Sequence, residues 1–322
     1  MRDGREDRES RIAPVRSLLP SSLRHFVTSS PMLSFCVLGS GSAGNSTLVA
    51  LGGNGRARYV LIDSGLSPRA TARRLGPLGV RPAEIGDIVL THLDRDHVHP
   101  GWISAVRRHC LAVHVHQRHR HAALRAGLPA ACLRAFGSVF RHGEGTEIET
   151  TLLGHDQLGS VGLVLEHAGL RLGFATDLGR VPETLLERLV GLHALAIESN
   201  YDRPMQTASD RPAALKRRIM GGLGHLSNEQ SLAAVLRVAE QGDLGHIALL
   251  HLSRQCNDPR LVRTLYARHA PHLLSRLTLS SQDRPTPWLH LRRPERIPRM
   301  AVAAGRQLNF LEMLPAGFLS AP

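Results

Sequence analysis

The chain has 322 residues, of which 42% are hydrophobic and only 4% aromatic, and its formal net charge is +13. The length suffices for a buried core, and because no apolar run could cross a bilayer and no signal peptide is recognisable, we expect a cytoplasmic protein and exclude a membrane protein. The positive charge is compatible with a polyanionic partner, but most basic residues are arginines scattered among Ala, Leu and Gly, so composition alone does not indicate nucleic-acid binding.

The first 31 residues differ in composition from the rest. They mix Arg with Asp and Glu, then Ser and Pro, without a sustained period, and we expect a disordered extension over residues 1–31. Met32 directly precedes the first predicted strand. We therefore hypothesise that Met32 is the natural start, which N-terminal sequencing of the native protein would test.

Residues 32–282 alternate short apolar runs with helical stretches. The predicted strands are Leu33–Leu38, Ser46–Leu51, Tyr59–Ile62, Ile88–Thr91, Ala112–His116, Thr146–Leu153, Ser160–His167, Leu170–Ala175, Ala194–Glu198, Ile247–Leu252 and Leu274–Leu279. The predicted helices are Ser67–Leu78, Trp102–His109, Pro182–Leu189, Pro212–Met220 and Ser227–Glu240. This order predicts an α/β domain with mixed rather than purely parallel sheets. Residues 283–322, rich in Pro and Arg, are predicted to form a loosely ordered tail.

A glycine-rich segment, Gly39–Gly44, matches the pattern G-x-G-x-x-G after the first strand. In a dinucleotide-binding fold a helix opens at this point, so that its N-terminus meets the pyrophosphate. Here the strand-like residues 45–49 follow instead. We therefore interpret the segment as the turn of a β-hairpin.

The segment Thr91–His97 carries the strongest chemical signal in the sequence. The buried strand that precedes it ends in four potential metal ligands within six residues: His92, Asp94, Asp96 and His97. A strand that stops at such a group presents imidazoles and carboxylates at a sheet edge, where a loop can surround a cation. The simpler alternative is a solvated polar loop, which two His and two Asp directly after a buried strand make less attractive.

The remaining histidines and the cysteines give weaker signals. His114 and His116 share one face of a short strand, and His119 and His121 follow, which we interpret as an exposed edge rather than a second metal site. The four cysteines, Cys36, Cys110, Cys132 and Cys256, form no C-x-x-C pair. Neither a structural zinc knuckle nor a disulfide scaffold is therefore indicated.

The segment Thr91–His97 resembles the Thr-His-x-His-x-Asp-His motif of the metallo-β-lactamase superfamily, with Asp94 in place of the usual second His. The resemblance implies a four-layer αββα sandwich of two mixed sheets flanked by helices. It also implies that His155, Asp177 and His251, each after a predicted strand, complete the metal ligands in chain order. Asp63, after another strand, matches the residue that braces the metal-binding loop.

A narrower resemblance covers about residues 33–266. Its motifs are Gly39–Asn45, Thr176–Gly179, Glu198–Asn200, Lys216–Ile219, Gly224–Asn228 and His251–Ser253. These are similar to the WalJ/YycJ-type subgroup, which implies phosphodiester hydrolysis, including exonuclease activity on DNA. Besides Asp94, Tyr201 and Cys256 depart from the subgroup, where His and Asn are common.

The resemblance implies a centre of two divalent cations. His92, Asp94 and His155 would hold the first cation, Asp96, His97 and His251 the second, and Asp177 would bridge them. Such a pair can generate a hydroxide from water at neutral pH. Zinc is expected, and the harder Asp94 oxygen shifts the preference towards manganese or iron.

Two further elements are candidates for contact with substrate. His225 is a candidate to bind the scissile phosphate or protonate the leaving oxygen, the alternative being a loop residue that helps to cap the next helix. The run Lys216–Arg218 could meet phosphates or form a solvated helix face. Asp96 and His225 are thus the catalytic candidates. The resemblance implies that the substrate is a nucleic acid or another phosphodiester. Two alternatives stay open: hydrolysis of a small ester, thioester, lactone or cyclic phosphodiester, and a non-catalytic metal-binding protein.

Overall fold

The computed structural model describes residues 32–293 except 54, 55 and 144, and these belong to one unit by their contacts. Their strands form two seven-stranded sheets. The first contains β1 (Leu33–Gly39), β2 (Ser46–Gly53), β3 (Arg56–Ile62), β4 (Ile85–Val89), β5 (Ala112–His116), β6 (Leu133–Phe136) and β14 (Leu289–His290), in the order β14-β1-β2-β3-β4-β5-β6. The second contains β7 (Val139–Arg141), β8 (Thr146–Leu153), β9 (Ser160–His167), β10 (Leu170–Ala175), β11 (Ala194–Glu198), β12 (His246–Leu250) and β13 (Leu277–Leu279), in the order β13-β12-β11-β10-β9-β8-β7.

Each sheet has an antiparallel half and a parallel half. In the first, β14, β1, β2 and β3 pair antiparallel, and β3 to β6 pair parallel. In the second, β7 to β10 pair antiparallel and β10 to β13 pair parallel. The carboxyl ends of the parallel strands within one sheet therefore point the same way, which gathers the residues that follow them.

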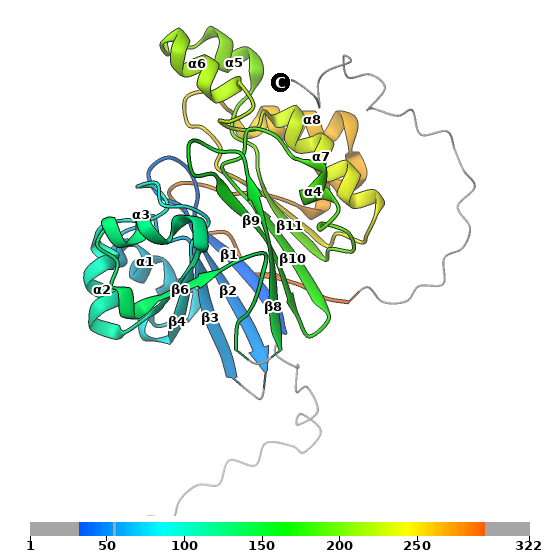
Figure 1. Cartoon of the computed structure of the whole chain (residues 1–322). Coiled ribbons are helices and arrows are strands. Elements are labelled where there is room, and N and C mark those ends of the chain that lie inside the picture. Colours follow the sequence, from blue (N-terminus) through cyan, green and yellow to red (C-terminus); the bar gives the residue numbers. More distant parts are fainter. Residues whose placement is uncertain (1–31, 54–55, 144, 294–322) are drawn as a thin grey trace, which may run out of the picture. The chain divides into compact units, whose positions relative to one another are not determined.

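Helices cover the outer faces of both sheets (Figure 1). Against the first sheet lie α1 (Pro68–Leu75), α2 (Gly101–His109) and α3 (Arg120–Arg125); against the second lie α4 (Glu183–Leu186), α7 (Asn228–Glu240) and α8 (Pro259–His269). Two more helices, α5 (Arg203–Ala208) and α6 (Ala213–Met220), project beyond the sheets in Figure 1. No helix in the described part of the chain is long and apolar enough to cross a bilayer.

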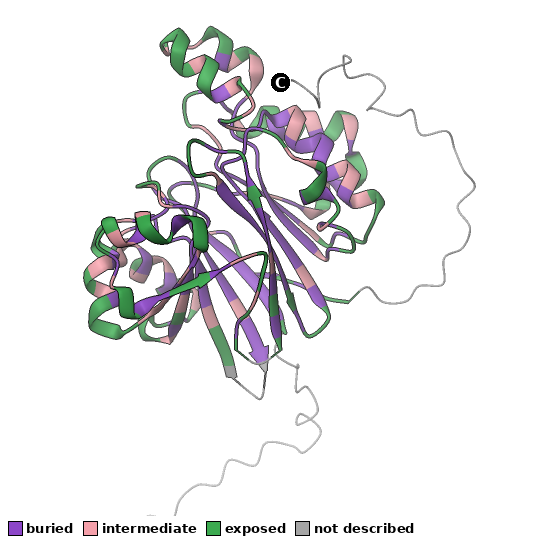
Figure 2. Ribbon diagram, in the orientation of Figure 1, coloured by how far each residue is buried: buried purple, intermediate pink, exposed green. Residues whose placement is uncertain are grey.

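Three apolar layers separate these elements, and Figure 2 shows most of the length of the central strands buried. Along β1, Phe35 and Val37 face the second sheet, whereas Cys36 and Leu38 face the helices, because successive side chains of a strand point to opposite faces. The middle layer fills the space between the sheets and the outer layers bury one face of each helix. The fold is thus the predicted αββα sandwich.

Local sequence explains where the longer helices begin. The Ser227 hydroxyl accepts a hydrogen bond from the backbone N–H of Gln230, and the Gln230 side chain accepts one from the Ser227 N–H, which forms a capping box for α7. Asp258 caps α8, whose first residue is Pro259. The predicted helices are all present, whereas α3, α5 and α8 were not predicted.

The prediction that a loose tail begins at residue 283 is wrong for residues 283–293. The Thr286 N–H donates to the Val37 carbonyl at 3.0 Å, and β14 pairs antiparallel with β1. A two-residue strand is too short to show a hydrophobic period, so only its pairing partner reveals it. The predicted extension at residues 1–31 and the remainder of the predicted tail lie outside the described residues.

One buried hydroxyl gives a stability prediction. Tyr266, on α8, is fully buried and its hydroxyl has no hydrogen-bond partner among the described residues. Because an unsatisfied buried polar group costs about 1–3 kcal/mol, Tyr266→Phe should increase the free energy of unfolding by about 1 kcal/mol in urea denaturation. For comparison, Leu195→Ala in the same core should lower it by about 2–5 kcal/mol. A clear loss of stability in Tyr266→Phe would mean that the hydroxyl has a partner.

Candidate metal centre

Asp63, the residue after β3, fixes the loop after β4 through hydrogen bonds. The Thr91 N–H donates to Asp63 Oδ1 at 2.8 Å, and the Thr91 hydroxyl donates to Oδ2 at 2.8 Å. Oδ2 of Asp63 also lies 2.8 Å from Nδ1 of His97. Both carboxylate oxygens are thereby used, and His97 is left with only Nε2 to present to a ligand.

Three residues that follow strands share an uncommon backbone conformation. Asp63, Asp177 and His251 have φ angles of 61°, 52° and 55°. This left-handed region is costly for residues other than glycine, although Asp and His adopt it more readily than branched residues. Such conformations persist where the surroundings impose them and cluster at functional sites. Here the left-handed conformations direct the three side chains towards the same site just beyond the ends of their strands.

The first group of these side chains surrounds Asp177, after β10. Oδ2 of Asp177 is 2.8 Å from Nε2 of His97, and Oδ1 is 3.0 Å from Nδ1 of His251. Asp96 lies beside the same two rings, its Oδ2 being 3.7 Å from His97 Nε2 and 3.5 Å from His251 Nε2. Burial disfavours the Asp177 carboxylate, but the two histidines more than offset it and hold its pKa well below the ordinary value.

The second group consists of His92, Asp94 and His155. Oδ2 of Asp94 lies 3.9 Å from His92 Nε2 and 4.0 Å from His155 Nε2, and the three residues can offer ligand atoms to one ion. Asp94 is half exposed, whereas both rings are buried. The two groups adjoin, because the His92 and His97 rings are 4.0 Å apart between centroids.

The buried nitrogens provide a test of whether these residues fit metal ions. Nε2 of His92 is buried and has no hydrogen-bond partner in the described chain, and the same is true of Nε2 of His251. Buried nitrogens without partners are rare unless something else binds them. Burial and the neighbouring His97 hold the pKa of His92 well below its usual value, so its ring is neutral, as a metal ligand must be. The donor set therefore fits divalent cations.

Glu198, at the end of β11, belongs to the centre although its role was not predicted. It is fully buried, and Oε1 lies 2.7 Å from Nδ1 of His225 and 3.1 Å from Nδ1 of His251. Its other oxygen accepts hydrogen bonds from the N–H groups of Leu178 and Leu226. Its position at the end of a parallel strand beside β10 and β12 was the signal that could have identified it.

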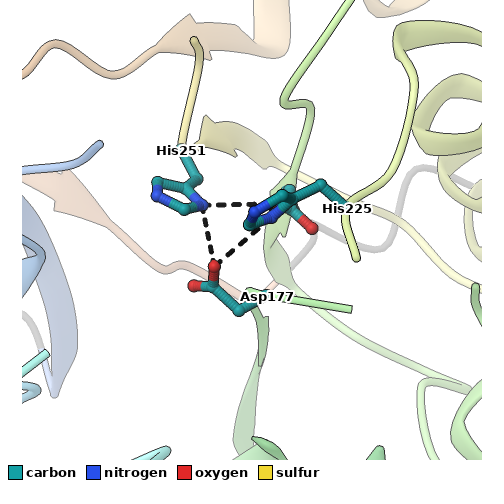
Figure 3. Close-up of side chains that lie close together, drawn as sticks. Asp177, His225 and His251 are labelled. Atoms are coloured by element: carbon teal, nitrogen blue, oxygen red, sulfur yellow. Dashed lines mark hydrogen bonds and ion pairs between the residues drawn. The ribbon is translucent and has the colours of Figure 1, made fainter. Parts of the chain in front are cut away.

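His225 points into the site rather than only capping α7. Its Nδ1 is 3.4 Å from Oδ1 of Asp177, the oxygen that also meets His251 (Figure 3). Burial lowers the pKa of His225, but the Glu198 carboxylate and then Asp177 outweigh burial and raise it above the ordinary value. The ring is thus favoured in its protonated form in this geometry.

The glycine-rich segment is the turn of the β1–β2 hairpin, as predicted, and it also reaches the centre. Nδ2 of Asn45 lies 3.2 Å from Asp96 Oδ2 and 2.9 Å from His97 Nε2. The Ser40 hydroxyl accepts a hydrogen bond from the His251 N–H. Close packing also explains Gly65, since a Cβ there would lie 1.7 Å from the Asp96 carbonyl oxygen. The turn therefore supports the loop of Asp96.

Two adjoining cavities open beside the centre. One of about 380 Å³ is lined by Asp96, Asp177, His225 and His251, and one of about 690 Å³ by His92 and His119. Asp94, His155 and Arg218 line both. Arg211 lines the first cavity and Arg217 the second. Lys216 is turned elsewhere, because its Nζ donates to the Thr207 carbonyl.

Besides Asp94, two residues differ from those common in the WalJ/YycJ-type subgroup, and these two lie together. Tyr201 and Cys256 are buried in a small apolar cluster with Ile219, at the base of α6. Burial raises the pKa of Tyr201 to about 12, with smaller electrostatic contributions from nearby charged residues. Both side chains are therefore packing residues beneath the cavity rather than part of the ligand set.

Comparisons with known proteins agree with this architecture. Residues 58–247, more than half of the chain, match the family model described as the beta-lactamase superfamily domain. The chain is 29% identical to exodeoxyribonuclease YycJ of Bacillus anthracis over 72% of this chain and 86% of that one. It is 25% identical to exodeoxyribonuclease WalJ of Streptococcus pneumoniae serotype 2 over 69% and 82%.

A solved structure shows the same fold. The metallo-β-lactamase fold protein YhfI from Bacillus subtilis superimposes with a TM-score of 0.58 at 14% identity, covering 79% of this chain and 98% of YhfI. The sandwich and the His/Asp groups at the strand ends agree with the family model and with this fold. The chain therefore belongs to the beta-lactamase superfamily, as a hydrolase of the metallo-β-lactamase fold.

Proposed function

We propose that the chain is a metal-dependent nuclease that hydrolyses phosphodiester bonds in DNA or RNA. The observation that carries this proposal is the His/Asp centre at the wall of an open, arginine-lined cavity. The exodeoxyribonucleases YycJ and WalJ, to which the chain is similar over most of its length, support the same substrate class.

The proposed ligands form two sets joined by one carboxylate. His92, Asp94 and His155 would hold one divalent cation, and Asp96, His97 and His251 the other, with Asp177 between them. Zinc is the expected metal, with manganese or iron as alternatives because Asp94 contributes oxygen in place of imidazole nitrogen. Bound there, two such ions would supply a nucleophile from water at neutral pH and neutralise charge on the phosphate.

In this proposal His225 would protonate the leaving oxygen. It lines the same cavity as Asp96 and Asp177, and the buried Glu198 carboxylate holds its Nδ1 at 2.7 Å. This contact orients the ring and favours the protonated form, which leaves Nε2 as the acid. Glu198 itself is a positioning residue, because it acts through His225 and His251.

The arginines supply the expected contacts with the phosphate backbone. Arg211 donates only to neutral oxygens, those of Gln206, Ser253 and Gln255. Its positive charge has no ion-pair partner in the described part of the chain, which leaves the charge available to a phosphate. Arg218 instead forms an ion pair with Asp156, next to His155. An open cavity with such side chains suits a polymer better than a small apolar ester.

The proposal can be tested by metal analysis with a substrate panel. Purified protein should contain bound metal and cleave DNA or RNA as well as bis-p-nitrophenyl phosphate, and Asp96→Ala should lose both activities. Metal-replete protein that cleaves only small esters or thioesters would support the alternative hydrolase. Metal-replete protein that is inert on every substrate would contradict the nuclease and favour a non-catalytic role. Equal activity of Asp96→Ala would remove Asp96 from the mechanism.

Arg211 gives a prediction about binding. For single-stranded DNA the logarithm of the binding constant falls with the logarithm of salt concentration by about 0.7 per phosphate contacted. Arg211→Ala should therefore reduce the magnitude of this slope by about 0.7 and weaken binding at low salt, measured by fluorescence anisotropy at several salt concentrations. Arg263→Ala, an exposed arginine on α8, is the matched control and should leave the slope unchanged. Equal slopes for all three proteins would exclude a phosphate contact by Arg211.

A further inference from the structure

A second group of potential ligands lies away from the centre, where the two sheets meet. It contains Asp87 on β4, His114 on β5 and His142 directly after β7. Nε2 of His114 is 3.1 Å from Oδ1 of Asp87, and Nε2 of His142 is 2.8 Å from Oδ2. One carboxylate thus meets two imidazoles, one from each sheet.

The expectation of an exposed histidine edge on β5 is wrong at His114. Its side chain is only 14% exposed, because Phe140 stacks on the ring with centroids 5.3 Å apart and Asp87 covers its Nε2. His119 is also buried. The sequence did not group Asp87 and His142 with His114, since the three residues lie on different strands and loops.

The geometry is similar to that of the metal centre. The separation of His142 Nε2 from Asp87 Oδ2 is 2.8 Å, the same as that of His97 Nε2 from Asp177 Oδ2. Two histidines and one carboxylate are a common ligand set for first-row divalent metal ions. The side chain of Asp87 is 24% exposed, which leaves access for a water molecule as a further ligand.

We propose that Asp87, His114 and His142 form a separate binding site for a divalent transition-metal ion such as Zn²⁺, which links the two sheets. The site is distinct from the centre, because these three residues form a ligand group that shares no member with the groups around Asp177 and His155. His142 is buried, and Nε2 makes the ring's hydrogen bond to Asp87 whereas Nδ1 has no partner among the described residues. Nε2 is therefore the nitrogen that holds this ring in the cluster.

The test is zinc stoichiometry. Full-length protein is stripped with a chelator, dialysed against Zn²⁺ and then against buffer, and analysed by inductively coupled plasma mass spectrometry. Asp87→Asn and His142→Gln should each contain one zinc equivalent fewer per chain than wild type. His121→Gln removes an exposed histidine outside the cluster and should match wild type. Equal zinc content in all four proteins would overturn the proposal and leave a hydrogen-bonded ion pair only.

Two additions separate this result from misfolding and from the proposed nuclease centre. Circular dichroism checks the fold, and His114→Gln, at a less buried ring, replaces His142→Gln if the latter is unfolded. The comparison of proteins with and without Asp87→Asn is repeated in the Asp177→Asn variant, in which the centre is impaired. Loss of one equivalent in both backgrounds supports the second site whether or not the nuclease proposal holds. Loss in neither background contradicts it.

Discussion

Asp177→Asn is expected to lower kcat/KM for DNA cleavage by about a thousandfold or more, with a matching loss of bound metal. The carboxylate meets His97 through one oxygen and His251 through the other, so it is the link between the proposed ligand sets. Metal ions contribute several kcal/mol to transition-state stabilisation, and each 1.36 kcal/mol changes the rate about tenfold. Initial rates and metal content should be measured on the same preparation.

Asparagine is the informative substitution at this position. It has nearly the same shape as aspartate and, like aspartate, tolerates the left-handed backbone that residue 177 adopts at a φ of 52°. A change in activity can then be assigned to the lost charge. Asp243→Asn, at an exposed carboxylate paired with Arg276, is the matched control and should keep full activity. Full activity and metal content in Asp177→Asn would contradict the proposed bridging role.

His225→Gln should lower kcat on DNA by about 10²- to 10⁴-fold and have a much smaller effect on bis-p-nitrophenyl phosphate. The deoxyribose oxygen needs a proton as it leaves, whereas p-nitrophenolate leaves readily without one. The measurement is the ratio of kcat values, variant to wild type, for the two substrates. If His225 is the general acid, this ratio should be far smaller for DNA than for bis-p-nitrophenyl phosphate.

The alternative role for His225, binding of the scissile phosphate, predicts equal losses on both substrates. Glu198→Gln provides a second measurement, because Glu198 holds the His225 ring through Nδ1. Because Glu198 acts through His225, Glu198→Gln should also lower kcat on DNA more than kcat on bis-p-nitrophenyl phosphate. It should in addition shift the pH dependence of kcat. His272→Gln, at an exposed histidine, is the control. Unchanged kcat and KM on DNA in His225→Gln would exclude both roles.

The order of the strands and their patterns allowed much of the fold to be predicted. The apolar run of a strand such as β1 is a local property, because a buried strand must carry apolar residues whatever it packs against. A strand is present at each predicted position, although β4 ends at Val89 rather than Thr91 and β13 begins at Leu277 rather than Leu274. Elements whose character depends on distant partners were missed. β6 is short and half exposed, β7 is short and mostly exposed, and β14 is defined by its pairing with β1.

The site could be anticipated to the extent that its residues follow strands. His92, Asp96 and His97 lie in the loop after β4 of the first sheet, whereas Asp177 and His251 follow β10 and β12 of the second. The strand directions gather each set at one edge of its own sheet, and the packing of the two sheets brings the sets together. Glu198 lies in the motif Glu198–Asn200 but was assigned no role, because its position at a strand end does not show which side chains it contacts. Its meaning comes from the two rings that it contacts.

The segment Thr91–His97 by itself determined the family resemblance, since its ligands are close together in the chain. Only the tertiary structure decided which other side chains join it. Asn45 reaches His97 from a hairpin turn, and Arg211 faces the cavity from the connection between α5 and α6. The same is true of Asp87, His114 and His142, which meet because two sheets pack face to face. Spacing along the sequence encodes local ligand groups, whereas contacts between sheets depend on packing geometry that no local pattern contains.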